Sequence, residues 1–505
     1  MGIVFRQSVK TTIVLLAGAI LGGLMIWLST KFVPKQELGF INSFTRWALM
    51  LSTFVPLGLV STLAVYIHRY ANEDRKRKML ITLCLLIPLI ITVLISIVYL
   101  LVPTWLIHHF QPEDRSLMRQ YYSWLPIYTL LFFYMAVLEQ YLCSQMKVAI
   151  SAFLREVVLR VLNIILVIFF GFGYLSFPGL FIGTVLVYLV PVLIFVLISV
   201  KTKGFGLLLK LDVFTNVEYK EIAHFTWYHF LLAISLLLMN MMDVTLLPFY
   251  DHDGFTSVAV YVVACYIVTL LYIPYKAFLQ SSFTVLTRAF TENDLVKAKD
   301  IFIRSSVNLL IPSIGIAIIL CCNLQNMVAI IGNGKNYAGI IPVFVIILVG
   351  QLVNFATGMN DQVLSTTNYY KFNFYLAMSL IIVMFILIKI LVPRYGIYGA
   401  AWSNAITFII FNTWKCIFIW KRLDMQPFSN KTVLIIVAGI PALAGGYFFP
   451  YLFEPTRHIY VHTFIDAIMR SCVIVIIYAG MLFWLKPSKD LEDYIASVRK
   501  NKRLF

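Results

Sequence analysis

The sequence predicts an all-α protein that crosses a membrane many times, and three observations lead to this fold class. The chain has 505 residues, of which 61% are hydrophobic and 12% charged, whereas soluble domains average about 45–50% hydrophobic and about 25% charged. Its mean hydropathy is +0.88. Apolar runs of about 20 residues, the length of a membrane-spanning helix, recur along the whole chain. Because these runs are continuous rather than alternating, the strands of a membrane β-barrel are excluded.

Charge clusters and Pro/Gly turns separate about fourteen such runs. Their centres lie at Gly18, Val55, Ile91, Phe133, Ile164, Tyr188, Leu236, Tyr266, Ile314, Gly350, Met384, Phe408, Gly439 and Val475. We predict two pseudo-repeated six-helix lobes plus two additional C-terminal helices, because the lead-ins VFRQSVKTT and EYKEIAHFTWYHF resemble each other. The expected boundaries are 1–200 for the N-terminal lobe, 201–223 for a cytoplasmic connection, 224–424 for the C-terminal lobe, 425–485 for the additional helices and 486–505 for a cytoplasmic tail.

The formal net charge of +17 is distributed unevenly along the chain. The termini and the even-numbered connections hold 27 Lys and Arg residues, and the odd-numbered connections hold seven. Since Lys and Arg accumulate in cytoplasmic loops, this predicts an even number of spans with both termini in the cytoplasm. The positive charge therefore indicates topology and contact with anionic lipids, and no nucleic-acid partner is expected.

Motifs of hydrolytic or metal chemistry are absent from the sequence. It contains no GxxxxGK[ST], HExxH or GxSxG motif. The seven cysteines fall in or beside apolar runs without metal-ligand spacing, so we expect them to be core residues. These absences argue against an enzyme and against a metal or cofactor.

Several ionisable residues nevertheless lie inside the apolar runs. A charge near the bilayer centre costs about 2.5–3.5 kcal/mol, so such residues normally face a helix bundle or a watery cavity. Glu156, Arg160 and Asn163 occupy positions i, i+4 and i+7 of one run and share a helix face, which predicts that they line a cavity. We expect Arg46, Arg160 and Lys276 to form the cationic part of that cavity.

The remaining candidates are polar or acidic residues of the same runs. The expected polar cavity residues are Asn163, Asn240, Tyr272, Gln280 and Asn360. Glu139, Glu156, Asp243 and Asp361 are either salt-bridge partners between helices or protonatable coupling residues, and the sequence leaves both roles open. Lys389, Lys415 and Arg470 have an alternative as side chains that snorkel to the interface, and Asp466 could neutralise Arg470 at i, i+4. Arg155 is expected to be ordinary positive charge at the cytoplasmic edge.

Four segments resemble the polysaccharide flippase family, the O-antigen and capsule-type translocases of the multidrug/oligosaccharidyl-lipid/polysaccharide exporter (MOP) superfamily. They are FRQSVKTTIVLLAGAILGGL, MMDVTLLPFY, VYVVACYIVTLLYIPYKAFLQ and the stretch from IIGNGKNYAG to TTNYYKF, which includes Gly358 and Asn360. One departure is that Val244 follows Asp243, where Arg or Lys is common in the family.

The resemblance implies a flippase that moves an undecaprenyl-pyrophosphate-linked oligosaccharide from the inner to the outer leaflet of the bacterial inner membrane by alternating access. Membrane lipids and the polysaccharide polymerase machinery are the implied partners, and H⁺ or Na⁺ is the implied coupling ion. A lipid II-type flippase and a cation-coupled multidrug exporter of the same superfamily are alternatives. A non-transport membrane scaffold is an alternative of a different class.

Overall fold

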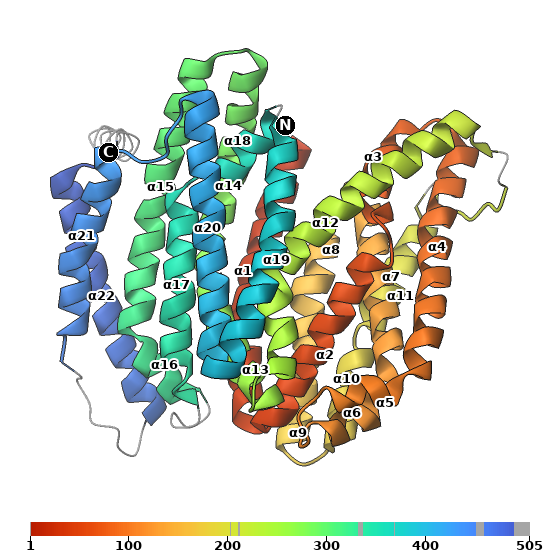
Figure 1. The fold of residues 1–505 in the computed structure, drawn as a ribbon, viewed down its shortest axis with the longest axis horizontal. Coiled ribbons are helices and arrows are strands. Elements are labelled where there is room, and N and C mark those ends of the chain that lie inside the picture. The colour runs from red at the N-terminus through yellow and green to blue at the C-terminus, as the bar shows by residue number, and fades with distance from the viewer. Residues whose placement is uncertain are drawn as a thin grey trace. The chain divides into compact units, whose positions relative to one another are not determined.

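The structure, a computed structural model, describes residues 2–202, 204–210, 213–331, 337–367, 369–450 and 459–488. Within these ranges the chain consists of α-helices and one π-helical turn, with no β-strand, as the sequence predicts. The helices form two compact units, residues 1–259 and 260–505 (Figure 1). The predicted tail beyond Ser488 lies outside the described residues.

The first unit contains twelve α-helices and the start of a thirteenth. They are α1 (Gly2–Phe32), α2 (Lys35–Phe54), α3 (Leu59–Arg69), α4 (Asp74–Leu101), α5 (Pro103–His108), α6 (Arg115–Tyr121), α7 (Trp124–Ser144), α8 (Val148–Phe153), the π-helical η1 (Leu154–Val158), α9 (Leu159–Gly171), α10 (Phe177–Leu186), α11 (Leu189–Val200), α12 (Asn216–Tyr250) and the first part of α13 (Gly254–Thr269).

The second unit contains the rest of α13 and nine further helices. They are α14 (Tyr272–Thr291), α15 (Leu295–Cys322), α16 (Leu324–Ile330), α17 (Ile340–Ala356), α18 (Asn360–Thr366), α19 (Tyr370–Tyr395), α20 (Ile397–Leu423), α21 (Asn430–Tyr447) and α22 (Ile459–Leu485). Each of the fourteen predicted span centres falls within a helix or in a short break between two successive helices.

These helices make the chain a multi-pass membrane protein. In the described part, eight helices are long and apolar enough to cross a membrane, and the number rises to eleven if each of three bent helix pairs is one span. Their outer faces are apolar. On α4, for example, the side chains of Ile90, Val93, Leu94 and Val98 are each at least half exposed. Large apolar side chains that are exposed on the outside of a bundle are placed to contact lipid acyl chains.

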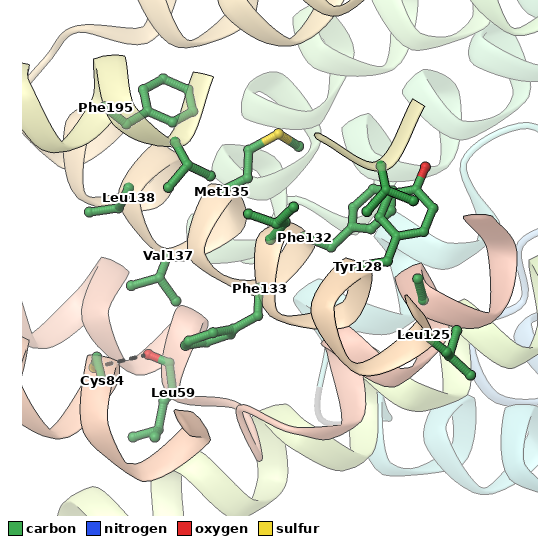
Figure 2. Packing of buried hydrophobic residues seen from close by; sticks show 14 of the residues in the cluster. Leu59, Cys84, Leu125, Tyr128, Phe132, Phe133, Met135, Val137, Leu138 and Phe195 are labelled. Atoms are coloured by element: carbon green, nitrogen blue, oxygen red, sulfur yellow. Dashed lines mark hydrogen bonds between the residues drawn. The ribbon is translucent and has the colours of Figure 1, made fainter. Parts of the chain in front are cut away.

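Helix α7 runs through the middle of the first unit and is apolar on several sides. Figure 2 shows Phe133 and Val137 on the side of Leu59 and Cys84, whereas Phe132 and Met135 point away from them. The Cys84 thiol donates to the Leu59 carbonyl oxygen at 3.6 Å. Most of α7 is buried among its neighbours, and its C-terminal part carries the polar residue Glu139.

Two short breaks bend spans within the units. Around Pro56 and Gly58, α2 and α3 form an angle of 47°, and around Gly358, α17 and α18 form an angle of 46°. Proline frees a backbone carbonyl and favours such kinks. A break in a helix exposes polar backbone, which membrane proteins tolerate where it lies against protein or a water-filled cavity.

Helix α12 belongs to the first unit, although the sequence places it at the start of a second lobe. Its Thr226 hydroxyl bonds the Thr62 hydroxyl of α3 at 2.7 Å. Further along, its Thr245 carbonyl accepts the indole N–H of Trp47 at 3.1 Å. These contacts connect α12 to α2 and α3, so the boundary between the units lies at 259/260.

The two additional C-terminal helices pack on α15 in the second unit (Figure 1). Arg470 of α22 is 1% exposed and pairs with Asp466 at 3.2 Å. It also donates to the carbonyl oxygens of Gly446 at 2.7 Å and Phe449 at 3.0 Å, and Asn326 of α16 donates to Asp466 at 2.7 Å. The predicted neutralisation of Arg470 by Asp466 is confirmed, and the alternative that Arg470 snorkels to the interface is wrong.

Two glycines provide a test of this packing. A Cβ at Gly39 of α2 would lie 1.7 Å from the Phe255 carbonyl oxygen of α13, whereas a Cβ at Gly480 of α22 would meet nothing within 4 Å. We expect Gly39→Ala to lower the free energy of unfolding by at least about 2 kcal/mol, because a backbone carbonyl cannot move aside cheaply. Gly480→Ala should raise it by about 0.5–1 kcal/mol. Thermal unfolding in detergent measures both, and equal effects would contradict the close α2–α13 contact.

Candidate functional site

A cavity of about 610 Å³ lies inside the first unit. The break between α2 and α3, helix α7 and the η1–α9 segment contribute most of its lining. Its lining comprises Met25, Leu49, Ser52, Thr53, Pro56, Gly58, Val60, Ser61, Phe132, Met135, Ala136, Glu139, Arg155, Glu156, Leu159, Arg160, Asn163, Tyr188 and Ala233. This volume is typical of a pocket for a small molecule or for part of a larger ligand.

Four charged side chains form a continuous chain of ion pairs in this cavity. Arg155 pairs with Glu139 at 2.6 Å and with Glu156 at 3.0 Å. Glu156 also pairs with Arg160 at 2.7 Å. Arg160 completes the chain by donating to the carbonyl oxygen of Gly18 on α1. The cavity therefore contains two guanidinium groups and two carboxylates, and these charges balance.

The local backbone brings the three charged residues Arg155, Glu156 and Arg160 to one cavity. Residues 154–158 form a π-helical turn between α8 and α9, and such turns occur often at functional sites. On the neighbouring α1, a Cβ at Gly18 would lie 2.8 Å from the Glu156 Cβ. Glycine at this position lets η1 approach α1 closely enough for Arg160 to reach the Gly18 carbonyl.

Most, but not all, of the site residues predicted in the N-terminal part of the chain line this cavity. Glu139, Glu156, Arg160 and Asn163 all line the cavity, and Asn163 is buried with its amide donating to the Leu159 carbonyl at 2.8 Å. Arg46 is half-buried on α2 and is not among the described residues that line the cavity. It nevertheless interacts electrostatically with Tyr188, as does Arg160.

Arg155 is a cavity residue that the sequence did not identify. Because it begins its apolar run, the sequence places it at the cytoplasmic edge as ordinary positive charge. In the structure it lies in the π-helical turn and pairs with Glu139 of α7. The signal available in the sequence was Glu139, since a carboxylate inside an apolar run requires a cation from another helix.

A second polar cluster lies in the second unit, where α18, α19 and α20 meet. Lys415 of α20 is fully buried, pairs with Asp361 of α18 at 3.0 Å, and lies 3.5 Å from the centre of the Phe411 ring. Asn373 of α19 donates to the same Asp361 oxygen at 3.3 Å. Asp361 is 46% exposed. The alternative that Lys415 snorkels to the interface is therefore wrong.

The other residues predicted in the second unit lie on α14 and α18. Asn360 is buried and donates to the Cys416 thiol at 3.3 Å, while its side-chain oxygen has no hydrogen-bond partner among the described residues. Tyr272 donates its hydroxyl to Gln351 of α17. Lys276 is exposed on α14, and the side chain of Gln280 lies outside the described residues.

The two polar residues predicted on α12 lie apart from the cavity of the first unit. Asp243 is 2% exposed and accepts the backbone N–H of Val244 at 2.8 Å. Asn240 is exposed. Neither belongs to the described cavity lining. Across the described ranges, His, Cys, Asp and Glu side chains form no group of three that could hold a metal ion.

The asymmetric burial of Lys415 and Asp361 leads to a prediction. Removing the carboxylate by Asp361→Ala leaves a fully buried ammonium without its counter-ion, which should cost about 3 kcal/mol of unfolding free energy. Lys415→Met keeps the side-chain volume and leaves a carboxylate that water can reach, so it should cost less than about 1.5 kcal/mol. Unfolding in detergent distinguishes the two variants.

Lys299→Met is the matched control for this prediction, because Lys299 forms an exposed pair with Asp424 at 2.9 Å. We expect the control to change the free energy of unfolding by less than about 0.5 kcal/mol. An equal or larger loss in Lys415→Met than in Asp361→Ala would contradict the argument from burial.

Comparison with solved structures identifies proteins of similar fold. The lipid II flippase MurJ in an inward closed conformation has a TM-score of 0.70 at 15% identity, over 94% of this chain and 100% of that one. An inward-facing multidrug resistance MATE family transporter of the MOP superfamily has a TM-score of 0.63 at 16% identity, over 82% and 94%.

A third similar structure is a MOP superfamily transporter from Pyrococcus furiosus, described by the reverse polarity of its binding pocket. It has a TM-score of 0.55 at 15% identity, over 84% of this chain and 95% of that one. No protein-family model and no curated protein matches the chain. At these identities the comparisons establish that the chain has the same helical fold as MOP transporters.

Proposed function

We propose that this protein is a MOP-type transporter that moves an undecaprenyl-pyrophosphate-linked glycan repeat unit from the inner to the outer leaflet for surface polysaccharide biosynthesis. The similarity in fold to MurJ and MATE transporters supports transport by alternating access rather than catalysis. The proposed location is the bacterial inner membrane with both termini in the cytoplasm, where membrane lipids and the polysaccharide polymerase machinery are partners.

The observation that carries this proposal is the pair of guanidinium groups in the cavity of the first unit. Arg155 and Arg160 line a large cavity that is otherwise mostly apolar. Planar guanidinium groups bind phosphate oxygens with two parallel hydrogen bonds and lose little hydration in doing so. Asn163 and Tyr188 border the same cavity, and amide and aromatic side chains are suited to sugar hydroxyls and ring faces. Arg46 and Lys276 remain proposed cationic contacts.

A cation-coupled multidrug exporter is the alternative of the same fold. An organic cation would have to displace an arginine from Glu139 or Glu156, just as an anion has to displace a carboxylate from Arg155 or Arg160. A lipid II-type flippase would use the same pyrophosphate chemistry and differs in the glycan. A scaffold without transport activity has no need of charged residues around a cavity, and it would tolerate their replacement.

The proposed driving force is the membrane potential or an H⁺ or Na⁺ gradient. Asp361 is the acidic candidate that combines solvent exposure with a buried cationic partner, Lys415. Protonation of Asp361, or binding of an ion to it, would change the strength of its pair with Lys415. The change would affect how α18, α19 and α20 pack together. Glu139 and Asp243 remain further proposed coupling residues.

Translocation in proteoliposomes tests the function directly. Vesicles containing a polyprenyl-pyrophosphate oligosaccharide are mixed with a membrane-impermeant glycosidase, and the rate at which the glycan becomes accessible is measured. We expect Arg160→Ala to lower this rate at least about tenfold, because a charge-assisted contact contributes about 1.5–3 kcal/mol. Combining it with Lys276→Ala should lower the rate further.

Arg288→Ala is the control for this assay, since Arg288 is exposed and pairs only locally with Glu292 in the described part of the chain. It should flip at the wild-type rate. If wild-type vesicles expose the glycan no faster than empty ones, with and without an imposed ion gradient and potential, the proposed substrate is wrong.

A further inference from the structure

Glu156 makes contacts that differ from those of the other cavity carboxylate. Its Oε1 accepts from Arg155 Nε at 3.0 Å and its Oε2 accepts from Arg160 Nη2 at 2.7 Å. Glu139 contacts Arg155 alone among the cavity arginines, at 2.6 Å. Glu156 thus holds one oxygen on each of two guanidinium groups, which is how a bridging phosphate group would be held.

Each guanidinium also has an anchor that does not depend on Glu156. Arg155 is bound through Nη1 to Glu139, and Arg160 is bound through Nη1 to the Gly18 carbonyl. Both anchors come from neighbouring helices, α7 and α1. If the Glu156 side chain rotated away, the two guanidinium groups would stay in place with their remaining N–H donors directed at the position it had left.

We propose that Glu156 is a built-in counter-anion that occupies the anion position of this cavity and is exchanged for a phosphate group of the ligand. The proposal rests on the function proposed above and assigns Glu156 as its specificity-determining residue. Glu156 packs against α1 at Gly18 through its Cβ, its backbone oxygen and its Oε2. In the proposed exchange its carboxylate rotates away from the two arginines and from Gly18.

Exchange of one anion for another explains how the cavity could discriminate between ligands. With Glu156 in place the four charges cancel, so the empty cavity does not attract free anions strongly. A ligand with a single negative charge gains little by replacing a carboxylate of equal charge. A pyrophosphate carries more charge and has oxygens on two phosphorus atoms, so it can contact both guanidinium groups at once. Glu156 thereby competes with every anion and excludes those that cannot contact both guanidinium groups.

Binding of inorganic pyrophosphate to the purified full-length protein tests the proposal, with isothermal titration calorimetry as the readout. Glu156→Gln keeps the shape of the side chain and removes its charge. We expect it to bind pyrophosphate about five- to tenfold more tightly than the wild type, since the ligand no longer competes with an ion pair. The gain should disappear in Glu156→Gln combined with Arg160→Ala.

Two further variants separate this role from a general effect of negative charge. Glu292→Gln removes a carboxylate outside the cavity, from the exposed pair with Arg288, so its affinity should change less than about twofold. Glu156→Asp retains the charge and should bind like the wild type. Pyrophosphate binding to Glu156→Gln that is no tighter than to the wild type, including no binding to either, would overturn the proposal.

Infrared difference spectroscopy keeps the proposal testable if Glu156→Gln does not fold. Addition of pyrophosphate to the wild type should shift a carboxylate stretching band as Glu156 leaves its arginine partners, and the shift should persist in Glu139→Gln. Absence of this shift would contradict the exchange.

The translocation assay reports separately on the proposed function. Tighter pyrophosphate binding by Glu156→Gln without glycan translocation by the wild type would retain the counter-anion and reject the lipid-linked substrate. Glycan translocation by the wild type without tighter pyrophosphate binding by Glu156→Gln would retain the lipid-linked substrate and reject the counter-anion.

Discussion

A charged side chain within the hydrocarbon layer needs a partner, and this requirement determines where the polar residues of this protein lie. In the first unit, Glu139, Arg155, Glu156 and Arg160 satisfy one another in sequence, and the last of them reaches a backbone carbonyl. In the second unit, Lys415 is satisfied by Asp361 and by the face of Phe411. Because the charged groups are paired inside the bundles, the outer faces of the helices can consist of apolar residues.

The two clusters meet the same requirement in different ways. Lys415 has no exposure, and its partner Asp361 is nearly half exposed, so only the carboxylate of this pair is accessible from outside the protein. Arg155 and Arg160 each have an anchor besides Glu156, so the anion between them can be replaced without loss of the cations. In the proposed function, the first cluster holds the ligand and the second responds to protons or ions.

Much of this architecture follows from the sequence, because apolar run length specifies spans directly: all fourteen predicted centres fall in helices or at short breaks. Helical periodicity also brought Glu156, Arg160 and Asn163 together. Periodicity does not identify Arg155, whose partner Glu139 lies on α7, or the burial of Lys415, whose partner Asp361 lies on α18. The position of α12 in the first unit likewise depends on contacts with α2 and α3, which are distant in sequence. Tertiary contacts of this kind leave no periodic signal in one chain.

The network around Arg470 has a consequence for biogenesis. An arginine and an aspartate in the same segment would each oppose entry into the bilayer from the translocon. Spaced at i, i+4, Asp466 and Arg470 can enter as an ion pair with no net charge. The Gly446 and Phe449 carbonyls at the end of α21 become available to Arg470 only when that segment is already alongside. The last two segments are therefore expected to leave the translocon together as a helical hairpin, held together by the hydrogen bonds of Arg470 to the end of α21.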